Sequence, residues 1–229
     1  MGTKFSTRVW VSVVGIASIF FGSKGYADTV ISVADFGLKP DTRENAVAYV
    51  QKAIEACRGK EPVTLVFPEG RYDFWPQYAH EKNYYETNTY DVFPKRLAML
   101  FEGLHNITVD GNGSQFVMHD RIQPITVENC DGVTLKNFSI DWDIPLTAQA
   151  RVTKVGSDFF EIEINVLESP YIIEDGKLVF VGEGWKSALG SMIEFESDTH
   201  FVVPGTGDLV LGRNWRDYTA VSLGSGFQK

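Results

Sequence analysis

Cysteine is scarce in this sequence, with only Cys57 and Cys130 among 229 residues. Neither cysteine lies in a CxxC pair or in another spacing typical of metal ligands, so no zinc site is indicated. Cys57 falls on a predicted helix and Cys130 in a coil far along the chain. We therefore expect two buried free thiols, although an exported protein could pair them in a disulfide.

Positive charge is also scarce. The chain carries 21 Lys and Arg against 30 Asp and Glu, a formal net charge of −9 at pH 7. No basic stripe is present, so the composition argues against a nucleic-acid binder. Aromatic residues make up 13% of the chain and suit stacking on sugars, although they are equally ordinary core material.

A hydrophobic run long enough to span a membrane is missing as well. Lys4 and Arg8 give a positive start, residues 9–21 are apolar, and the stretch GYA at 25–27 ends in a small residue. The apolar run of about 13 residues is too short for a comfortable membrane span. This order of features is typical of an export signal.

We expect the signal to be removed after Ala27. Asp28 rather than cysteine would then begin the mature chain, which excludes a bacterial lipid anchor on that residue. Removing residues 1–27 leaves 18 basic and 30 acidic residues, a net charge of −12. The sequence thus predicts an acidic periplasmic or secreted protein with no membrane span.

Signatures of metal and phosphate loops are not found. The stretch DGNG at residues 110–113 lacks the acid spacing of a calcium loop and the Lys-Ser/Thr of a phosphate loop. We interpret it as a turn and expect no metal site.

An amphipathic helix is predicted over residues 41–57. Asp41 or Thr42 can cap it, and apolar residues recur at spacings of three and four. The members of this stripe are Val47, Val50, Ile54 and Cys57. Because a strand follows at residues 63–67, such a helix would cover the open first edge of a stack of strands.

A short strand motif then repeats. NITV at residues 106–109 aligns with GVTL at 132–135, an offset of 26 along the sequence, and a further unit stands at 125–127. The offset falls in the range of roughly 20–50 residues that is typical of repeat architectures. The spacing predicts a solenoid over residues 28–150 in which each turn holds several short strands.

The sequence pattern changes after Arg151. Short alternating strands separated by turns over residues 151–229 predict antiparallel hairpins or a small barrel, inserted in or appended to the solenoid. The last residues contain no cap and do not return to the spacing of the repeat. We expect the chain to be an N-terminal fragment of a longer protein.

The start of the chain resembles a known cap. The stretch DFG at residues 35–37, the helix and FPEGRY at 67–72 are similar to the N-terminal cap of the pectate-lyase-like superfamily. That resemblance implies an all-β fold, a right-handed parallel β-helix with a helical cap.

A narrower resemblance is carried by YDFWP at residues 72–76, GNGS at 111–114 and NFSIDWD at 137–143. These stretches look like the α-1,3-galactosidases of glycoside hydrolase family 110, in which small β-barrel modules accompany a β-helix. The resemblance implies an exo-acting, inverting hydrolase of terminal α-1,3-linked galactose, as in blood group B glycans. Its substrate would be a galactose-terminated oligosaccharide or glycoconjugate.

Inversion requires two carboxyl groups roughly 6.5–9.5 Å apart, and it needs no cofactor because carboxylates supply both acid and base. The family's catalytic aspartates lie on later coils, so the resemblance implies catalytic residues C-terminal to Lys229. Two alternatives stay open. One is a polysaccharide lyase on the same fold, and the other is a non-catalytic carbohydrate-binding or surface solenoid.

Five residues are candidates for substrate binding. Asp141 and Asp143 flank Trp142 at a strand end, where positions two apart face the same side, although aspartates before Ile-Pro also suit a turn. Arg121 offers a fork of donors to a sugar or a carboxylate, or else holds a surface turn with Asp120.

The fifth candidate, Trp75, opens an aromatic segment at residues 72–94 that shows no period and that we interpret as a functional loop. Its rings, which include Tyr78, Tyr84 and Tyr85, would either line a sugar groove or pin the loop to the solenoid wall.

Overall fold

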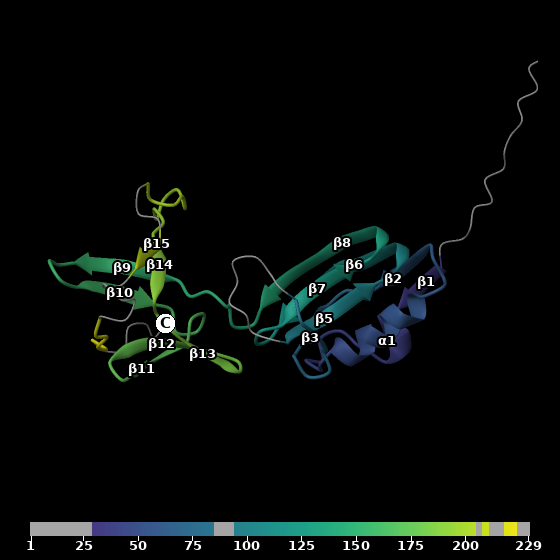
Figure 1. Ribbon diagram of the computed structural model, residues 1–229, viewed down its shortest axis with the longest axis horizontal. Helices are drawn as coiled ribbons and strands as arrows, with labels where there is room; N and C mark the ends of the chain where they lie inside the picture. The colour runs from purple at the N-terminus through teal and green to yellow at the C-terminus, as the bar shows by residue number, and fades with distance from the viewer. Residues whose placement is uncertain (1–28, 85–93, 205–207, 211–217, 224–229) are drawn as a thin grey trace, which may run out of the picture.

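The computed structural model describes residues 29–84, 94–204, 208–210 and 218–223. Two parts follow one another along the chain, the first from β1 to β8 with α1 and the second from β9 to β15 (Figure 1). The predicted export signal and Tyr85 lie outside the described residues. The described part is mostly β-structure with little helix.

The first part contains a long sheet in which all strands run parallel. Its strands are β1 (Thr29–Ser32), β2 (Val63–Val66), β3 (Arg71–Phe74), β6 (His105–Met118) and β8 (Asp131–Trp142). β6 is long enough to pair with β2 along its first half and with β3 along its second half. β8 lies along the other side of β6.

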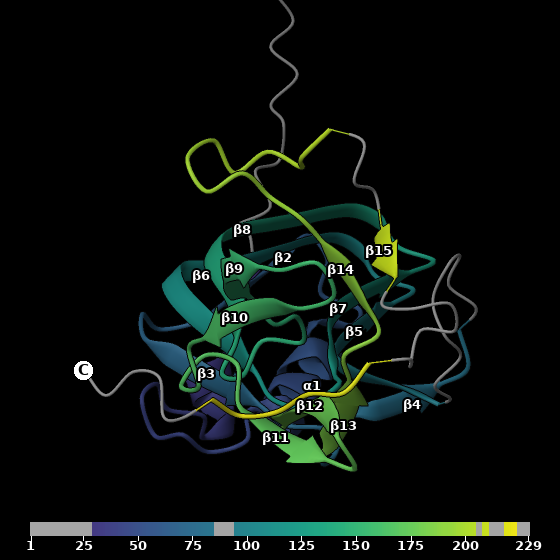
Figure 2. The ribbon, with the colours of Figure 1, turned by 90° about the vertical axis from the view of Figure 1, so that its left-hand side faces the viewer.

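A short sheet forms a second wall of the first part. It contains β4 (His80–Lys82), β5 (Lys95–Glu102) and β7 (Gln123–Glu128). β5 and β7 are parallel, whereas β4 pairs antiparallel with β5. In Figure 2, β5 and β7 lie to one side of β6 and β8, with α1 below and between them.

From β5 to β8 the chain alternates between the two sheets. Ile107 pairs with Val133 in the long sheet, and Met99 pairs with Ile125 in the short sheet, so partners in both sheets are separated by an offset of 26. The offset found in the sequence is therefore the strand register of this part of the chain.

The register changes once, between Asp110 and Ser114, where the offset falls from 26 to 24. Beyond this irregularity Phe116 pairs with Ile140. Gly111 lies at the change, and a Cβ added to it would stand 2.5 Å from the Cβ of Phe138 and 2.7 Å from the carbonyl oxygen of Asn137. Only glycine lets β6 and β8 approach this closely.

Substituting Gly111 with Ala is expected to lower the free energy of unfolding by about 2 kcal/mol, because the backbone of β8 must move away. Urea unfolding of the variant tests this. The matched change Ser139→Ala, at an exposed position of β8, is expected to stay within about 0.5 kcal/mol of the parent protein. An unaffected Gly111→Ala protein would contradict the close approach.

The core lies between the two sheets and is closed by α1 (Val47–Cys57) and the short 3-10 helix η1 (Val33–Phe36). The four residues of the predicted apolar stripe are all buried, which confirms that face of the helix. α1 packs against β1, β2 and β5. Phe116 is the centre of an aromatic group and contacts the rings of Phe67, Tyr72, Phe74 and Phe138.

The predicted start of the helix at residue 41 is wrong. Asp41 and Arg43 have left-handed backbones, and the helix begins only at Val47. Before it, the backbone runs beside β3, where Asp41 N–H donates to the Arg71 carbonyl and Ala46 N–H donates to the Asp73 carbonyl, each at 2.8 Å. Pairing with a strand outweighs local helix propensity in this segment.

The predicted irregular segment at residues 72–94 also needs correction, because it begins inside β3 and contains β4. Both cysteines are free, as expected, but Cys130 is only half-buried. None of the helices in the described ranges is long and apolar enough to cross a membrane.

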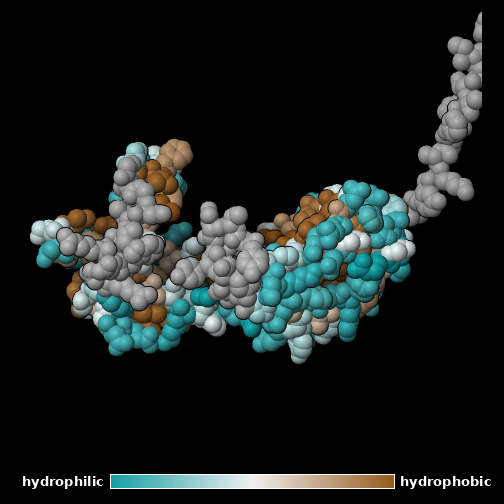
Figure 3. Space-filling view, in the orientation of Figure 1, coloured by the Kyte–Doolittle hydropathy of each residue, from teal (hydrophilic) through white to brown (hydrophobic). Residues whose placement is uncertain are grey.

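The second part consists of antiparallel pairs, as the alternating pattern predicted. Its strands are β9 (Ala150–Val155), β10 (Phe160–Ile164), β11 (Tyr171–Glu174), β12 (Lys177–Gly182), β13 (Trp185–Ala188), β14 (Ser191–Ile193) and β15 (Asp208–Val210). Ile164, Leu178 and Val179 are its buried apolar side chains among the described residues. Much of its apolar surface stays exposed, as the brown areas of Figure 3 show.

Candidate functional site

Three strands of the long sheet end side by side, and the residues that follow them meet. The N–H of His119, after β6, donates to the Phe74 carbonyl at 3.0 Å. The N–H of Asp143, after β8, donates to the Met118 carbonyl at 3.0 Å. The ladder thus places Trp75, His119 and Asp143 next to one another, beyond the C-terminal ends of β3, β6 and β8.

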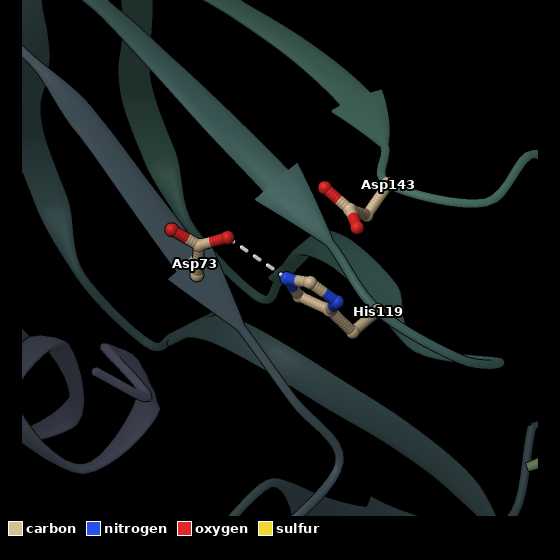
Figure 4. A group of neighbouring side chains, drawn as sticks. All are labelled: Asp73, His119 and Asp143. Atoms are coloured by element: carbon tan, nitrogen blue, oxygen red, sulfur yellow. Dashed lines mark hydrogen bonds and ion pairs between the residues drawn. The ribbon is translucent and has the colours of Figure 1, made fainter. Parts of the chain in front are cut away.

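His119 lies between two carboxylates. Its Nε2 is 2.9 Å from Oδ1 of Asp73, and its Nδ1 is 2.8 Å from Oε2 of Glu183. His119 and Asp73 are both buried, and their side chains point toward each other (Figure 4). Each ring nitrogen of His119 therefore faces a carboxylate oxygen, a hydrogen-bond acceptor when ionised.

Arg71 supplies the positive charge on the other side of Asp73. Its Nη2 donates to Asp73 Oδ1 at 2.5 Å and to Asp143 Oδ1 at 2.7 Å. Arg43 lies farther out, 3.6 Å from Asp143 Oδ1. Two carboxylates therefore share one guanidinium at the end of the long sheet.

The arginine keeps both carboxyl groups ionised. Burial alone would raise the pKa of Asp73, but hydrogen bonds from Arg71 and His119 outweigh it and lower the pKa below its usual value. The hydrogen bond from Arg71 likewise lowers the pKa of Asp143. A general acid needs a raised pKa, so neither group is suited to protonate a leaving oxygen.

The spacing of these groups also argues against a role as the acid and base of an inverting glycosidase. Ligand atoms of Asp73, His119 and Asp143 lie within 4.8 Å of one another, closer than the carboxyl separation of an inverting glycosidase. The same three side chains could coordinate a metal ion, but Arg71 already donates to both carboxylates. The negative charge of the cluster is therefore balanced by positively charged side chains of the protein.

Trp75 covers this cluster. Its ring stacks on the His119 ring with centroids 3.8 Å apart and planes 10° apart. Asn45 fixes the backbone here, since its Oδ1 accepts from Trp75 N–H at 3.2 Å and its Nδ2 donates to the Gln77 carbonyl at 2.9 Å. The predicted candidate Trp75 is thus held rigidly beside His119.

The turn between β12 and β13 closes the cluster from the second part. Glu183 comes from this turn, and a Cβ added to the next residue, Gly184, would stand 2.4 Å from the Asp120 carboxylate. The guanidinium of Arg121 lies 5.8 Å from the centre of the Trp185 ring. The two parts of the chain therefore touch at the end of β6.

The remaining predicted residues have separate partners. Trp142 is half-buried, and its Nε1 donates to the Asp120 carbonyl at 3.2 Å. Asp141 is exposed and accepts from the Trp142 N–H at 2.8 Å. Arg121 donates its backbone N–H to Asp120 Oδ1 at 2.6 Å, which fits the surface-turn alternative. The structure brings Trp75 and Asp143 to the cluster and leaves Asp141 at its margin.

Sequence reasoning did not single out Arg71, Asp73, His119 or Glu183. A signal for the first two was present, because Arg71 and Asp73 alternate with the apolar Tyr72 and Phe74 and therefore share one face of β3. The contact between His119 and Glu183 joins two distant stretches of the sequence, and no local pattern indicates it.

Exchanging Glu183 for Gln is expected to lower the free energy of unfolding by about 1.5 kcal/mol, because His119 loses a charged hydrogen-bond acceptor. Limited proteolysis should also cut the second part faster. The matched control is Glu174→Gln, which removes an ion pair to Lys186 whose two side chains are about half exposed. Control and parent should differ by less than about 0.5 kcal/mol, and an equal effect of both changes would contradict the contact.

Comparison with known proteins gives a family match for the second part. Residues 148–226 match the family model described as GLAA-B beta-barrel domain I. This match supports the expected small β-barrel module. The antiparallel sheets formed by β9 to β15 lie within the matched residues.

Whole-chain relatives cover both parts. The chain is 58% identical over 200 residues to a protein of Bacteroides thetaiotaomicron named alpha-1,3-galactosidase B, a match that covers 87% of this chain and 32% of that protein. It is 36% identical to alpha-1,3-galactosidase B of Phocaeicola vulgatus, covering 88% of this chain and 32% of that protein. It is also 36% identical to alpha-1,3-galactosidase A of Shewanella woodyi, covering 73% of this chain and 28% of that protein. The chain spans about a third of the length of these relatives.

Proposed function

We propose that this chain, a homologue of the α-1,3-galactosidases as the resemblance predicted, forms part of a glycoside hydrolase that removes terminal α-1,3-linked galactose. The observation that carries the proposal is the 58% identity to a protein of that name over 87% of this chain. The substrate would be a galactose-terminated oligosaccharide or glycoconjugate. An exported protein, as the stretch from Met1 to Ala27 suggests, would meet such glycans outside the cytoplasm.

The fold that we propose for the first part is a right-handed parallel β-helix. The equal offset of 26 in the parallel pairs β5–β7 and β6–β8 supports it, because each turn of such a helix adds one strand to each wall. The helix α1 then serves as the cap of the first coil.

The exposure of apolar side chains on β7 and β8 supports further coils of the β-helix. Val109 is 1% exposed, but its register partner Leu135 on β8 is 40% exposed. In the short sheet Phe101 is 0% exposed and its partner Val127 is 47% exposed. Interior positions thus become exposed one turn later, as expected if another coil of the β-helix packs on β7 and β8.

The reaction that we propose is inverting hydrolysis by a pair of carboxyl groups. One protonates the leaving oxygen and the other activates water, and they require a separation of roughly 6.5–9.5 Å. The low pKa and short spacing of Asp73 and Asp143 do not meet this requirement. We therefore assign the acid and the base to the part of the relatives that this chain does not span.

The residues of this chain would form one wall of the substrate site, beside the catalytic acid and base. Trp75 offers an aromatic ring, and Asp143 and Arg71 offer acceptors and donors at the end of the long sheet. Rigid groups of this kind position a sugar and exclude water, while the chemistry is performed by others.

A chimera tests the proposal. The 200 matching residues of this chain replace the aligned segment of the Bacteroides thetaiotaomicron relative, and the chimera is assayed on an α-1,3-linked galactobioside and on polygalacturonate. Release of free galactose is the expected result. Unsaturated uronides would instead favour a lyase, and binding without turnover, while the unmodified relative is active, would favour a non-catalytic solenoid.

A further inference from the structure

A cavity of about 490 Å³ opens between the segment after β3 and the β12–β13 turn. Two aromatic residues and several polar residues line it. We call it the Tyr78 cavity and define it by Trp75, Tyr78, Glu81, Arg96, Asp120 and Glu183. Its volume lies within the roughly 300–1,000 Å³ that small-molecule sites occupy.

Tyr78 is held in an unusual position at this cavity. It is 73% exposed, and its φ of 68° lies in the left-handed region, which bulky side chains rarely adopt. The carbonyl of Tyr78 accepts from Gln51 Nε2 at 2.8 Å, and the carbonyl of Gln77 accepts from Asn45 Nδ2 at 2.9 Å. The backbone is thus fixed in a strained form that keeps an aromatic ring in solvent, a feature that is concentrated at ligand sites.

Each acidic side chain that defines the cavity has a partner. Glu81 lies 3.6 Å from Arg96, and Glu183 is hydrogen-bonded to His119. Asp120 adds a further carboxylate, of which one oxygen accepts from the Arg121 N–H. These partnered carboxylates and the guanidinium of Arg96 offer acceptors and donors for hydroxyl groups, and the excess of three carboxylates over one guanidinium opposes an anion.

We infer that the Tyr78 cavity is a binding subsite for one neutral sugar residue. The exposed ring of Tyr78 receives the apolar face of the sugar, and the carboxylates and Arg96 receive its hydroxyl groups. Trp75 lines the subsite, whereas Asp73 is not among its lining residues. The inference rests on the proposed function for the choice of galactosides as probes, and the subsite performs no chemistry.

Titration of the full chain tests the subsite. An α-1,3-galactobioside, lactose and maltose serve as probes, with binding followed by saturation-transfer NMR and by tryptophan fluorescence. Tyr78→Asn removes the ring with a residue that accepts a left-handed backbone. We expect at least tenfold weaker binding of the galactobioside by this variant.

The matched control is Phe201→Ala, since Phe201 is equally exposed at 73% and lies in the second part. The control is expected to bind like the parent protein, and both variants should unfold at the same urea concentration as the parent. Equal binding by Tyr78→Asn and the parent, or no binding of any probe by the parent, would overturn the subsite.

The outcomes separate the subsite from the proposed function. An active chimera together with a full chain that binds no sugar overturns the subsite and leaves the galactosidase proposal standing. Binding of maltose without binding of either galactoside supports a sugar subsite at Tyr78 and counts against the galactosidase proposal.

Discussion

Replacing Asp73 with Asn is expected to lower the free energy of unfolding by about 3 kcal/mol, the cost of leaving a buried charge without its partner. The side chain of Asp73 is fully buried, and it holds both Arg71 and His119 in place. The variant would leave the guanidinium and the imidazole facing a neutral amide. Urea unfolding at pH 7, followed by near-UV circular dichroism, measures the change.

The matched control is Asp141→Asn, since Asp141 is exposed and accepts from its neighbour's N–H. That variant is expected to differ from the parent by less than about 0.5 kcal/mol. If the two substitutions lower the free energy of unfolding equally, Asp73 does not stabilise the buried charge cluster.

The acid stability of the protein should depend on the same residue. The pKa of Asp73 and that of Asp143 are lower in the folded than in the unfolded chain, so their contribution is present above the usual aspartate pKa of about 3.9. It is lost as the pH falls toward the folded values. The free energy of unfolding should therefore decline below about pH 4, and less steeply for Asp73→Asn than for the parent protein.

Replacing Phe116 with Ala is expected to lower the free energy of unfolding by about 4 kcal/mol. Phe116 is fully buried, and its ring contacts those of Phe67 and Phe138 with centroids 4.7 Å apart in each pair. Removing the ring opens a cavity between β3, β6 and β8, which the fixed register of these strands cannot close. Urea unfolding measures the loss.

The comparison variant is Phe195→Ala, because Phe195 is exposed in the second part. A change of less than about 0.5 kcal/mol is expected there. A small effect at Phe116 would mean that the long sheet does not close over a single packed core.

Much of the first part could be predicted from the sequence because its signals are local and periodic. The apolar stripe of α1 and the offset of 26 both follow from side-chain spacing, and each corresponds to a described feature. β3 was missed because it is only four residues long and two of them, Arg71 and Asp73, are charged. The helix start was misplaced because Asn45, just before Val47, forms a bridge with Asp73 of β3, a strand that follows the helix in the sequence.

The site could be predicted only in part. Trp75 and Asp143 were named from their residue types, but their meeting depends on the register change between Asp110 and Ser114. A constant offset of 26 would have placed Pro145 beside His119, whereas the observed shift places Asp143 there. Glu183 reaches the cluster from another sheet, and only the folded chain indicates that contact.

The anomeric form of the galactose that the chimera releases tests the proposed inverting hydrolysis most directly. Proton NMR during the first minutes of hydrolysis of an α-1,3-linked galactobioside distinguishes the two anomers before they equilibrate. We expect β-galactose to appear first, as inversion at an α-linkage requires. Initial release of α-galactose, or no release of galactose while the unmodified relative is active, would contradict it.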